Sequence, residues 1–445
     1  MQRLVIVGGS DAGISAALRA REVDPSWEVE MLLADRWPNY SICGLPYLLS
    51  GEVAHTEDLA HRTAQDIAAA GIATRLEHRV TAIDPIARTV TAETADGQVV
   101  VEYDALVLGT GAGPRRPPVD GLGLDGVHLL HTIDDALALG RRLVPGTRAT
   151  IVGAGYIGLE MADALRHRDL DVTVVEALTE VMPTVDPEIG AMVRATLERR
   201  RVRVLVDTVV SAIGEDEGAL RVTTSAGAWP ADVVLVVTGV APAIELGVGL
   251  GIATGTGDAL VVDERMATGL DGIWAAGDCV HTHHRLLEEP TYLPLGTTAH
   301  KQGRVAGENA VGGDRHFAGV LGTQVVKVFD LAIAGTGLGA RQAAQRFDAR
   351  TEQVVVPDHK RYYPGAVDLA IRVTAERRTG RLLGAQIAGP PAGQVAKRID
   401  VFATAIHHNM TVDALSDLDL SYTPPFGSPW DAVQMAAQAW SRAAA

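Results

Sequence analysis

The sequence predicts an α/β protein with two doubly wound, Rossmann-like parallel sheets and a C-terminal α+β domain. Two segments share the same order of a β-branched run, a glycine turn and an alanine-rich helix former: RLVIVGGSDAGISAALRA at 3–20 and RATIVGAGYIGLEMADAL at 148–165. This order is typical of the strand, tight turn and helix that open a nucleotide-binding domain. From about residue 321 the glycine pattern stops, and strand-like runs precede a helical stretch, KRIDVFATAIHH.

Length and composition agree with a folded protein of several domains. The chain has 445 residues, of which 47% are hydrophobic and 21% charged, and this length predicts two to four domains. The formal charge of −16 argues against nucleic acid or an acidic membrane surface as the main partner. Two cysteines cannot form a disulfide scaffold, and we expect a cytoplasmic protein without a signal peptide or a membrane span.

The second glycine turn, GAGYIG at 153–158, is a complete G-x-G-x-x-G. Gly153, Gly155 and Gly158 permit the turn, the approach of a pyrophosphate and the packing of the helix on the strand. The next strand, DVTVVE, ends in Glu176, at the interval expected for the acid that binds a ribose 2′-hydroxyl. The two residues after it are not basic, which favours NADH over NADPH, although an arginine from elsewhere would also reach a 2′-phosphate.

The first glycine turn is irregular. Gly8, Ser10 and Gly13 stand where three glycines would be, Leu33 follows the next strand, and the nearest carboxylate, Asp35, comes two residues late. Two later stretches are expected to complete the same domain: YDALVLGTGAGPRRP at 103–117 and DGIWAAGDCV at 271–280. The first nucleotide domain is therefore predicted at 1–114 and 248–320, with the second inserted at 115–247 and a third domain at 321–445.

Several motifs together resemble one family. The two glycine turns, LGTG at 108–111, AAGD at 275–278 and a single cysteine in SICGLPY at 41–47 resemble the pyridine nucleotide-disulfide oxidoreductases. Within them the chain is similar to the single-cysteine branch of coenzyme A-disulfide reductases, NADH oxidases and persulfide reductases. The resemblance covers essentially the whole chain and extends to LPLGTTAHKQGRVAGEN at 293–309, HKRYYPGA at 359–366 and DLSYTPPFGSPWD at 419–431.

The resemblance implies a homodimer that binds FAD in the interrupted domain and NADH or NADPH in the inserted one. About 125 C-terminal residues would form the dimer interface, and Tyr363 and Tyr422 would reach the partner's active site, with adjacent Tyr362 as an alternative to Tyr363. The implied cofactor-binding residues are Gly8, Ser10, Gly13, Asp35, Thr110, Gly111, Gly277 and Asp278 for FAD, and Gly153, Gly155, Gly158, Glu160 and Glu176 for the nicotinamide nucleotide, with Glu160 near the nicotinamide.

Cys43 is the predicted redox residue. Two-cysteine relatives carry the second sulfur at the position of Leu48, so the partner of Cys43 would have to be a small thiol, a persulfide or an oxygen as sulfenic acid. A reactive thiol needs a lowered pKa, which a helix beginning near Gly44–Pro46 and a neighbouring flavin are expected to supply. The other cysteine, Cys279, is expected to be a packing residue.

Proton-donating side chains decide between the reactions that a single cysteine can carry out, namely peroxide or oxygen reduction and disulfide reduction. Water-forming oxidases and peroxidases of the family carry a histidine in the first glycine turn, where this chain has Asp11, and an aspartate is not an equivalent proton donor. The phenols of Tyr363 and Tyr422 are able to protonate or orient a leaving thiolate. We therefore predict reduction of a low-molecular-weight disulfide or persulfide, with coenzyme A as one candidate thiol. Arg19, Arg21 and Arg62 are candidates for its phosphates.

Departures from the family pattern keep other functions open. Ile42 precedes Cys43 where the family usually has Asn or Ser, so the identity of the substrate is in doubt. One alternative is an NADH oxidase, or a flavin reductase that passes electrons to oxygen or a quinone; another is a flavoprotein redox sensor with little turnover. His281, His283 and His284 are expected to lie in a solvated loop, and we assign no metal.

Overall fold

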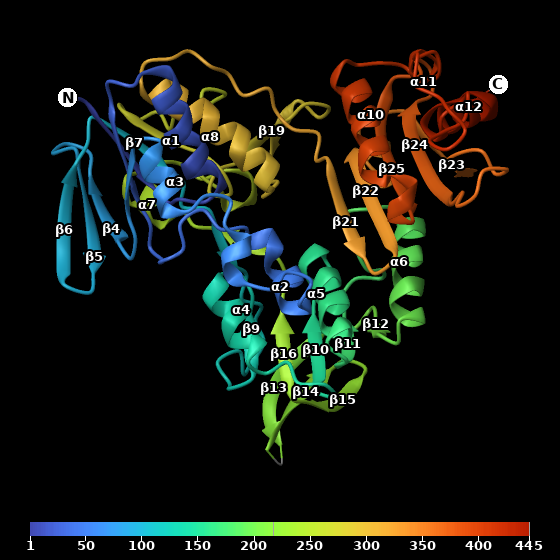
Figure 1. The fold of residues 1–445 in the computed structure, drawn as a ribbon, viewed down its shortest axis with the longest axis horizontal. Coiled ribbons are helices and arrows are strands. Elements are labelled where there is room, and N and C mark those ends of the chain that lie inside the picture. Colours follow the sequence, from blue (N-terminus) through green and yellow to red (C-terminus); the bar gives the residue numbers. More distant parts are fainter. Residues whose placement is uncertain (217, 445) are drawn as a thin grey trace.

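The computed structural model describes residues 1–216 and 218–444. Its first sheet is parallel, with strand order β18-β7-β1-β2-β3. Its strands β1, β7 and β18 are nearly continuous apolar runs because helices cover the sheet, among them α1 (Asp11–Val23) and α8 (Gly296–Ala310), which pack against each other (Figure 1). The strands are β1 (Arg3–Val7), β2 (Glu28–Leu32), β3 (Ile72–Arg75), β7 (Ala105–Leu108) and β18 (Ile273–Ala275).

The second sheet is also parallel, with order β12-β11-β10-β16-β9. The chain passes between the two sheets twice, and the passing segments β8 (Ala112–Pro114) and β17 (Val240–Pro242) pair with each other. The strands and helices of this part are β9 (Val127–Leu129), β10 (Arg148–Val152), β11 (Asp171–Val175), β12 (Arg203–Leu205), β16 (Val233–Val236), α4 (Ile133–Gly140), α5 (Tyr156–His167) and α6 (Pro187–Arg199).

The C-terminal part is an antiparallel sheet of order β21-β22-β25-β24-β23 with helices on it. One face packs against α10 and α12, and β21, β22 and β25 contact α6 of the second domain, so β24 and β25 are buried almost throughout. The elements are β21 (Gln324–Val328), β22 (Leu331–Gly337), α9 (Ala340–Ala344), β23 (Ala349–Pro357), β24 (Asp368–Glu376), β25 (Leu382–Gly389), α10 (Val395–His407), α11 (Val412–Ser416) and α12 (Ala432–Ala444).

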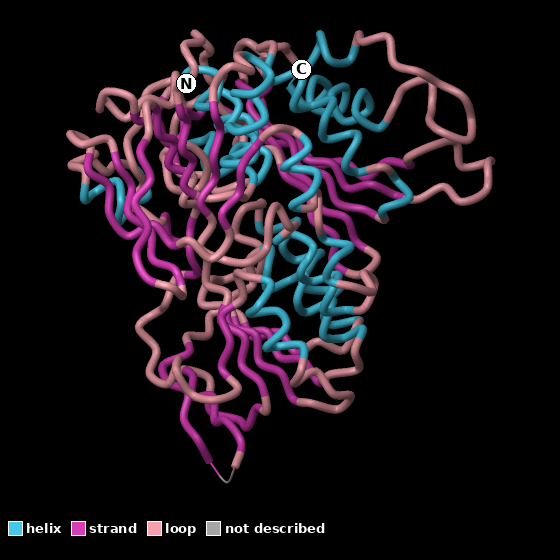
Figure 2. The backbone as a smooth tube through the Cα atoms, turned by 60° about the vertical axis from the view of Figure 1, so that its left-hand side comes forward, coloured by secondary structure: helices cyan, strands magenta, loops and turns pink. Residues whose placement is uncertain are grey.

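Small sheets and short helices complete the fold. The sheet β13–β15 forms the lower tip of the molecule in Figures 1 and 2, away from both termini. No helix among the described residues is long and apolar enough to cross a membrane. The remaining elements are α2 (Leu45–Ser50), α3 (Ala64–Ala69), β4 (Arg79–Asp84), β5 (Thr89–Thr94), β6 (Gly97–Glu102), β13 (Val210–Asp216), β14 (Ala219–Thr224), β15 (Gly227–Ala231), α7 (Glu245–Gly249), β19 (Thr282–His284), β20 (Glu289–Thr291) and 3₁₀ turns at Ile42–Gly44, Thr56–Leu59, Thr256–Asp258 and Pro391–Gly393.

Candidate functional site

The turn between β1 and α1 requires glycine at two of its three motif positions. Gly8 has φ +103°, and a Cβ added there would lie 2.2 Å from the Gly109 carbonyl oxygen. A Cβ added at Gly13 would lie 2.0 Å from the Gly8 oxygen. Ser10 is the N-cap of α1, but its side chain makes no capping hydrogen bond. The irregular motif therefore still brings the backbone of β1, α1 and the turn after β7 into close contact.

The turns after β7 and β18 lie beside this first turn. The Thr110 hydroxyl donates to the Ala243 carbonyl at 2.6 Å, and Gly111 has φ +70°. The Gly277 amide donates to Gln302 Oε1 at 3.0 Å. Burial, and then the charge of Asp11, raise the pKa of the adjacent Asp278 to about 6. Three turns that are far apart in the sequence thus lie together. They contain the predicted acid Asp278 and the predicted glycines.

Asp35, by contrast, is occupied within its own loop. It lies after β2, where its carboxylate accepts from the Trp37 amide at 2.8 Å, and burial raises its pKa. Leu33 takes the place directly after the strand and packs on Gly9, where an added Cβ would lie 2.4 Å from the Leu33 side chain. A cofactor role for Asp35 stays a prediction.

The turn after β10 has the geometry that a complete glycine motif predicts. Gly153 has φ +107°, and a Cβ at Gly158 would lie 2.0 Å from the Gly153 oxygen, whereas a Cβ at Gly155 would meet no atom within 4 Å. Glu176 is buried at the end of β11 and accepts from the amides of Ala154 at 2.8 Å and Leu178 at 3.0 Å. These two bonds fix the carboxylate and leave acceptor capacity for a further donor.

Cys43 lies in the 3₁₀ turn before α2, which begins one residue after Gly44 with proline in its first turn, as predicted. The residue is exposed. With the protein groups alone, desolvation, and then the charges of Asp11, Glu160 and Asp278, raise the pKa of Cys43. The helix α2, with only six residues, does not offset these effects. The lowered pKa expected with a bound flavin stays a prediction.

These three carboxylates show what surrounds the thiol. Asp11 follows the first glycine turn, Asp278 follows β18, and Glu160 belongs to α5 of the second domain. Because each one influences Cys43 electrostatically, the segments predicted to hold the two cofactors converge on this cysteine. Cys279 is different: it is fully buried, and its sulfur lies 3.4 Å from the Ala276 carbonyl, as expected for a packing residue.

Glu160 lies where α5 packs against α2. Burial raises the pKa of Glu160 to about 7, while the Tyr47 side chain and Lys327 oppose that rise. Burial and the charge of Glu160 in turn raise the pKa of Tyr47 to about 12. Lys327, on β21, lies 3.4 Å from Glu52 and 3.6 Å from Asp163. Sequence reasoning missed the roles of Tyr47, which ends the quoted SICGLPY motif, and of Lys327, because both come near Glu160 only in the folded chain.

The structure distinguishes the two neighbouring tyrosines. Tyr363 packs edge-on against His359, with ring centroids 5.8 Å apart. Tyr362 is 74% exposed, and interaction with the Tyr422 side chain raises its pKa. Tyr362, the alternative considered from the sequence, is therefore the one that lies beside Tyr422. The expectation that these tyrosines act on a partner's site stays a prediction.

The three candidate arginines differ in their availability. Arg19 is bound to Glu308 at 2.7 Å and Glu22 at 2.9 Å. Arg21 donates to the carbonyls of Pro25 and Trp27. Arg62 lies in the turn before α3, where its charge contributes to lowering the pKa of Asp66. A phosphate ligand would have to compete with internal partners at the first two positions.

The histidine cluster serves the loop around β19. His281 Nε2 lies 3.0 Å from the Val262 carbonyl, and His284 Nδ1 accepts from the Leu286 amide at 3.3 Å. His284 is buried, so the prediction of a solvated loop is wrong at this residue, because β19 pairs with β20 and turns that ring inward. Within the described residues, no group of three or more His, Cys, Asp or Glu side chains is arranged to hold a metal ion.

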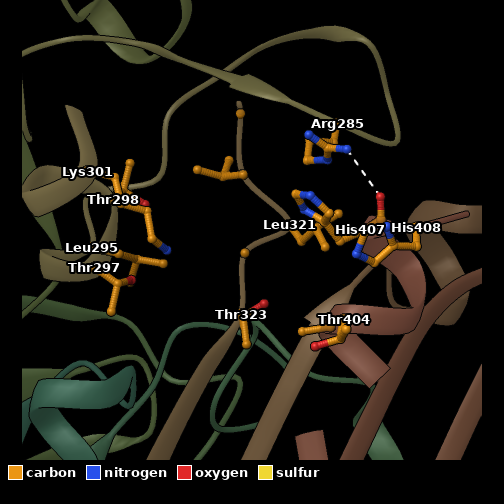
Figure 3. A pocket seen from close by; sticks show the side chains of 14 residues that line it. Arg285, Leu295, Thr297, Thr298, Lys301, Leu321, Thr323, Thr404, His407 and His408 are labelled. Carbon is orange, nitrogen blue, oxygen red and sulfur yellow. Dashed lines mark hydrogen bonds between the residues drawn. The ribbon is translucent and has the colours of Figure 1, made fainter. Parts of the chain in front are cut away.

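A cavity of about 360 Å³ lies between α8 and α10. Figure 3 shows Lys301 of α8 on one side and Arg285, His407 and His408 on the other, with Arg285 donating to the His407 carbonyl at 3.2 Å. None of the predicted catalytic residues lines this cavity. The geometry around Cys43, and not this cavity, therefore defines the candidate active site.

Comparisons with known proteins identify the family of the chain. A model of the family described as "Pyridine nucleotide-disulphide oxidoreductase" matches residues 2–303, and the dimerisation domain of the same family matches residues 323–433. A "NAD(P)H sulfur oxidoreductase (CoA-dependent)" of Pyrococcus abyssi is 34% identical over 96% of both chains. An "NADH oxidase" of Methanocaldococcus jannaschii is 33% identical over 98% of both chains.

A solved structure is similar over nearly the whole chain. The NAD-dependent persulfide reductase from A. fulgidus has a TM-score of 0.95 and 35% identity, and the match covers 99% of this chain and 83% of that one. These findings confirm the predicted fold class and the resemblance stated from the sequence motifs. The chain therefore belongs to the pyridine nucleotide-disulphide oxidoreductase family.

Proposed function

We propose that this chain is an FAD-dependent NAD(P)H oxidoreductase that reduces a low-molecular-weight disulfide or persulfide through Cys43. The observation that carries the proposal is the surroundings of this thiol. Cys43 is exposed, and the carboxylates that act on it belong to the first glycine turn, to the loop after β18 and to α5. A small substrate can therefore reach a sulfur that lies between the two predicted cofactor sites.

Membership of the family implies FAD and NAD(P)H as cofactors, and the residues present fit both. Added Cβ atoms at Gly111 and Gly155 would meet nothing within 4 Å, so open space adjoins both sets of turns. Gln302 Nε2 is buried without a hydrogen-bond partner among the described residues, while its Oε1 holds Gly277. That amide is a donor available to a bound group.

The proposal assigns residues to each cofactor. FAD would be held by the turns of the first domain, and NAD(P)H by the turn after β10, with the fixed carboxylate of Glu176 accepting from a ribose hydroxyl. The same carboxylate would repel a 2′-phosphate, so we include a preference for NADH. The assigned residues are Gly8, Ser10, Gly13, Asp35, Thr110, Gly111, Gly277 and Asp278 for FAD, and Gly153, Gly155, Gly158, Glu160 and Glu176 for NAD(P)H.

The proposed reaction balances with one nicotinamide per substrate. A disulfide, NAD(P)H and one proton give two thiols and NAD(P)⁺; a persulfide gives one thiol and hydrogen sulfide instead. The Cys43 thiolate attacks one substrate sulfur, the substrate S–S bond breaks, and the other half leaves as a thiolate that takes up a proton. A bound flavin supplies the two-electron path between nicotinamide and sulfur.

A homodimer completes the proposed site, consistent with the dimerisation domain matched at 323–433. Tyr422, with Tyr362 or Tyr363, would protonate or orient the leaving thiolate in the partner's site. For a coenzyme A thiol, which the name of one relative suggests, Arg62 and the paired Arg19 and Arg21 are the candidate phosphate ligands. A cytoplasmic location belongs to the proposal, because a thiol-dependent enzyme needs a reducing compartment.

The test replaces Cys43 by Ser. We expect disulfide- or persulfide-dependent NADH oxidation to fall by at least about 100-fold, while NADH still bleaches the flavin absorbance. Cys279→Ala is the matched control, because that thiol is buried away from solvent, and it should keep the activity. Unchanged turnover of Cys43→Ser would defeat the proposal.

A second candidate is an NADH oxidase. It is favoured by the exposure of Cys43, which leaves the sulfur accessible to oxygen species, and by the relative from Methanocaldococcus jannaschii that carries this name. Aerobic NADH consumption in the absence of any disulfide, at a rate matching the best disulfide, would favour this candidate over the first.

A further inference from the structure

We propose that His300 is a positioning residue of the Cys43 site: held by Ser15, it pairs with Asp11 and so sets the charge beside the sulfur. The inference rests on the proposed function, since it concerns the reactivity of the thiol to which that function assigns the chemistry. Nothing in the glycine motif indicates it, because the histidine comes from another element of the chain.

The geometry links three side chains from α1 and α8. The Ser15 hydroxyl oxygen lies 2.7 Å from His300 Nδ1, across 285 residues of sequence. His300 Nε2 lies 3.3 Å from Asp11 Oδ1. The other carboxylate oxygen of Asp11 lies against the start of α8, where a Cβ added at Gly296 would be 2.6 Å away. Nδ1 of His300 is therefore hydrogen-bonded and Nε2 faces the Asp11 carboxylate, which lies beside the N-termini of both helices.

Glycines on α8 hold His300 at this distance from α1. A Cβ at Gly303 would lie 2.2 Å from the Ala12 oxygen, and one at Gly307 would lie 2.1 Å from the Ala16 oxygen. Residues 300, 303 and 307 share one helix face. The close approach of the two backbones thus fixes the imidazole over the first turn of α1.

The arginines of this helix pair already have partners. Arg19 binds Glu22 and Glu308, and Arg304 lies 3.3 Å from Glu22. Lys301 faces the cavity towards α10 (Figure 3). His300 is thus the basic side chain positioned to offset Asp11, and its side chain is 47% exposed, so protons exchange with solvent.

Ser15 allows the imidazole to carry either charge. Nε2 lies 3.3 Å from Asp11 Oδ1, close enough for charge attraction when the ring is cationic. Nδ1 then accepts from the Ser15 hydroxyl when the ring is neutral, and donates to the same oxygen when the ring is cationic. Protonation therefore costs no hydrogen bond, and it converts the Asp11 charge into a neutral pair.

This change acts on the sulfur through Asp11. The Asp11 charge contributes to raising the pKa of both Cys43 and Asp278. Pairing with a cationic His300 removes that contribution and favours the Cys43 thiolate. Glu160, from α5, and Asp278 are further charged groups that raise the pKa of Cys43.

The experiment measures the rate at which iodoacetamide alkylates Cys43 in the reduced holoenzyme, by mass spectrometry over a pH series. Cys279 is fully buried, so the two thiols are separable. We expect His300→Gln to slow alkylation near neutral pH by about fivefold and Asp11→Asn to accelerate it, the sizes set by one nearby charge in a partly solvated site. Lys301→Gln is the matched control and should leave the rate unchanged.

The double variant separates electrostatics from damage to the fold. In the Asp11→Asn background, His300→Gln should change the rate by less than about twofold, because its charge partner is gone. Wild-type alkylation in His300→Gln, or the same slowing in both backgrounds, would overturn the inference. If His300→Gln fails to bind flavin, Ser15→Ala provides the second measurement and should also slow alkylation. The proposed function fails separately, if Cys43→Ser keeps its turnover, whatever the alkylation rates.

Discussion

Glu160 stabilises the folded protein when protonated and destabilises it when ionised. Burial raises the pKa of this carboxyl group from 4.5 to about 7, so the folded state keeps the proton over a pH range in which the unfolded chain has lost it. A group with a raised pKa contributes stability that is present below the unfolded pKa and is lost as pH rises towards the folded one. The contribution of Glu160 therefore disappears between about pH 4.5 and pH 7.

The size of the effect follows from the shift. A carboxyl pKa moved from 4.5 to about 7 corresponds to about 3 kcal/mol in a site shielded from water, and to about 2 kcal/mol for a side chain with some solvent access. Glu160→Gln removes the ionisation and keeps the shape. We expect the variant to exceed the wild type in unfolding free energy by about 2 kcal/mol at pH 8, and by much less at pH 5.

The assay is urea unfolding of the holoenzyme followed by tryptophan fluorescence at both pH values. Glu198→Gln is a matched control, since that glutamate is on the neighbouring helix α6 and is exposed. A stability difference between Glu160→Gln and wild type that is equal at the two pH values would refute the reasoning. A gain in stability would also identify Glu160 as a residue retained for function at a cost to the fold.

Two further predictions concern the packing that holds the site together. We expect Gly303→Ala to lower the free energy of unfolding by about 1–3 kcal/mol, because the added methyl group forces α8 away from α1. Gly249→Ala, where a Cβ meets nothing within 4 Å, should lower it far less. Urea unfolding measures both variants, and equal losses would contradict the contact between the two helices. We expect Arg372→Met to lower the free energy of unfolding by about 3–5 kcal/mol, because Arg372 lies 2.9 Å from buried Asp186. Arg88→Met, which breaks an exposed ion pair, should lower it by about 1 kcal/mol or less. A similarly small loss for Arg372→Met would refute the prediction.

The fold class was predictable because its signals are local. A β-branched run, a glycine turn and an alanine-rich helix lie within about twenty residues, and the glycines at positions 8, 13, 153 and 158 prove to be required by contacts of 2.0–2.6 Å at an added Cβ. The interruption of the first sheet was inferred from β18, whose apolar run and Gly-Asp turn repeat the pattern of a parallel strand end. The domain boundaries themselves stay a prediction.

The electrostatics of the site were not predictable in the same way. The helix start at Gly44–Pro46 was correct, but the rise in the Cys43 pKa that the protein groups cause was not foreseen, because it comes from desolvation and from carboxylates in three distant segments. The burial of His284 was missed for a similar reason, since it depends on the pairing of β19 with β20. Interactions between residues hundreds of positions apart leave no periodicity or spacing in the sequence.

Asp11 stands in the first glycine turn where water-forming oxidases and peroxidases of the family carry a histidine. The fold changes how this difference is interpreted. From the sequence, the aspartate counted as the loss of a proton donor. In the structure, Asp11 lies 3.3 Å from an imidazole that another helix supplies, so a basic side chain lies beside this turn although the turn itself carries an acid. Because the Asp11 carboxylate acts on Cys43, the proposed pair with His300 adjusts the charge beside the sulfur without a basic group in contact with it.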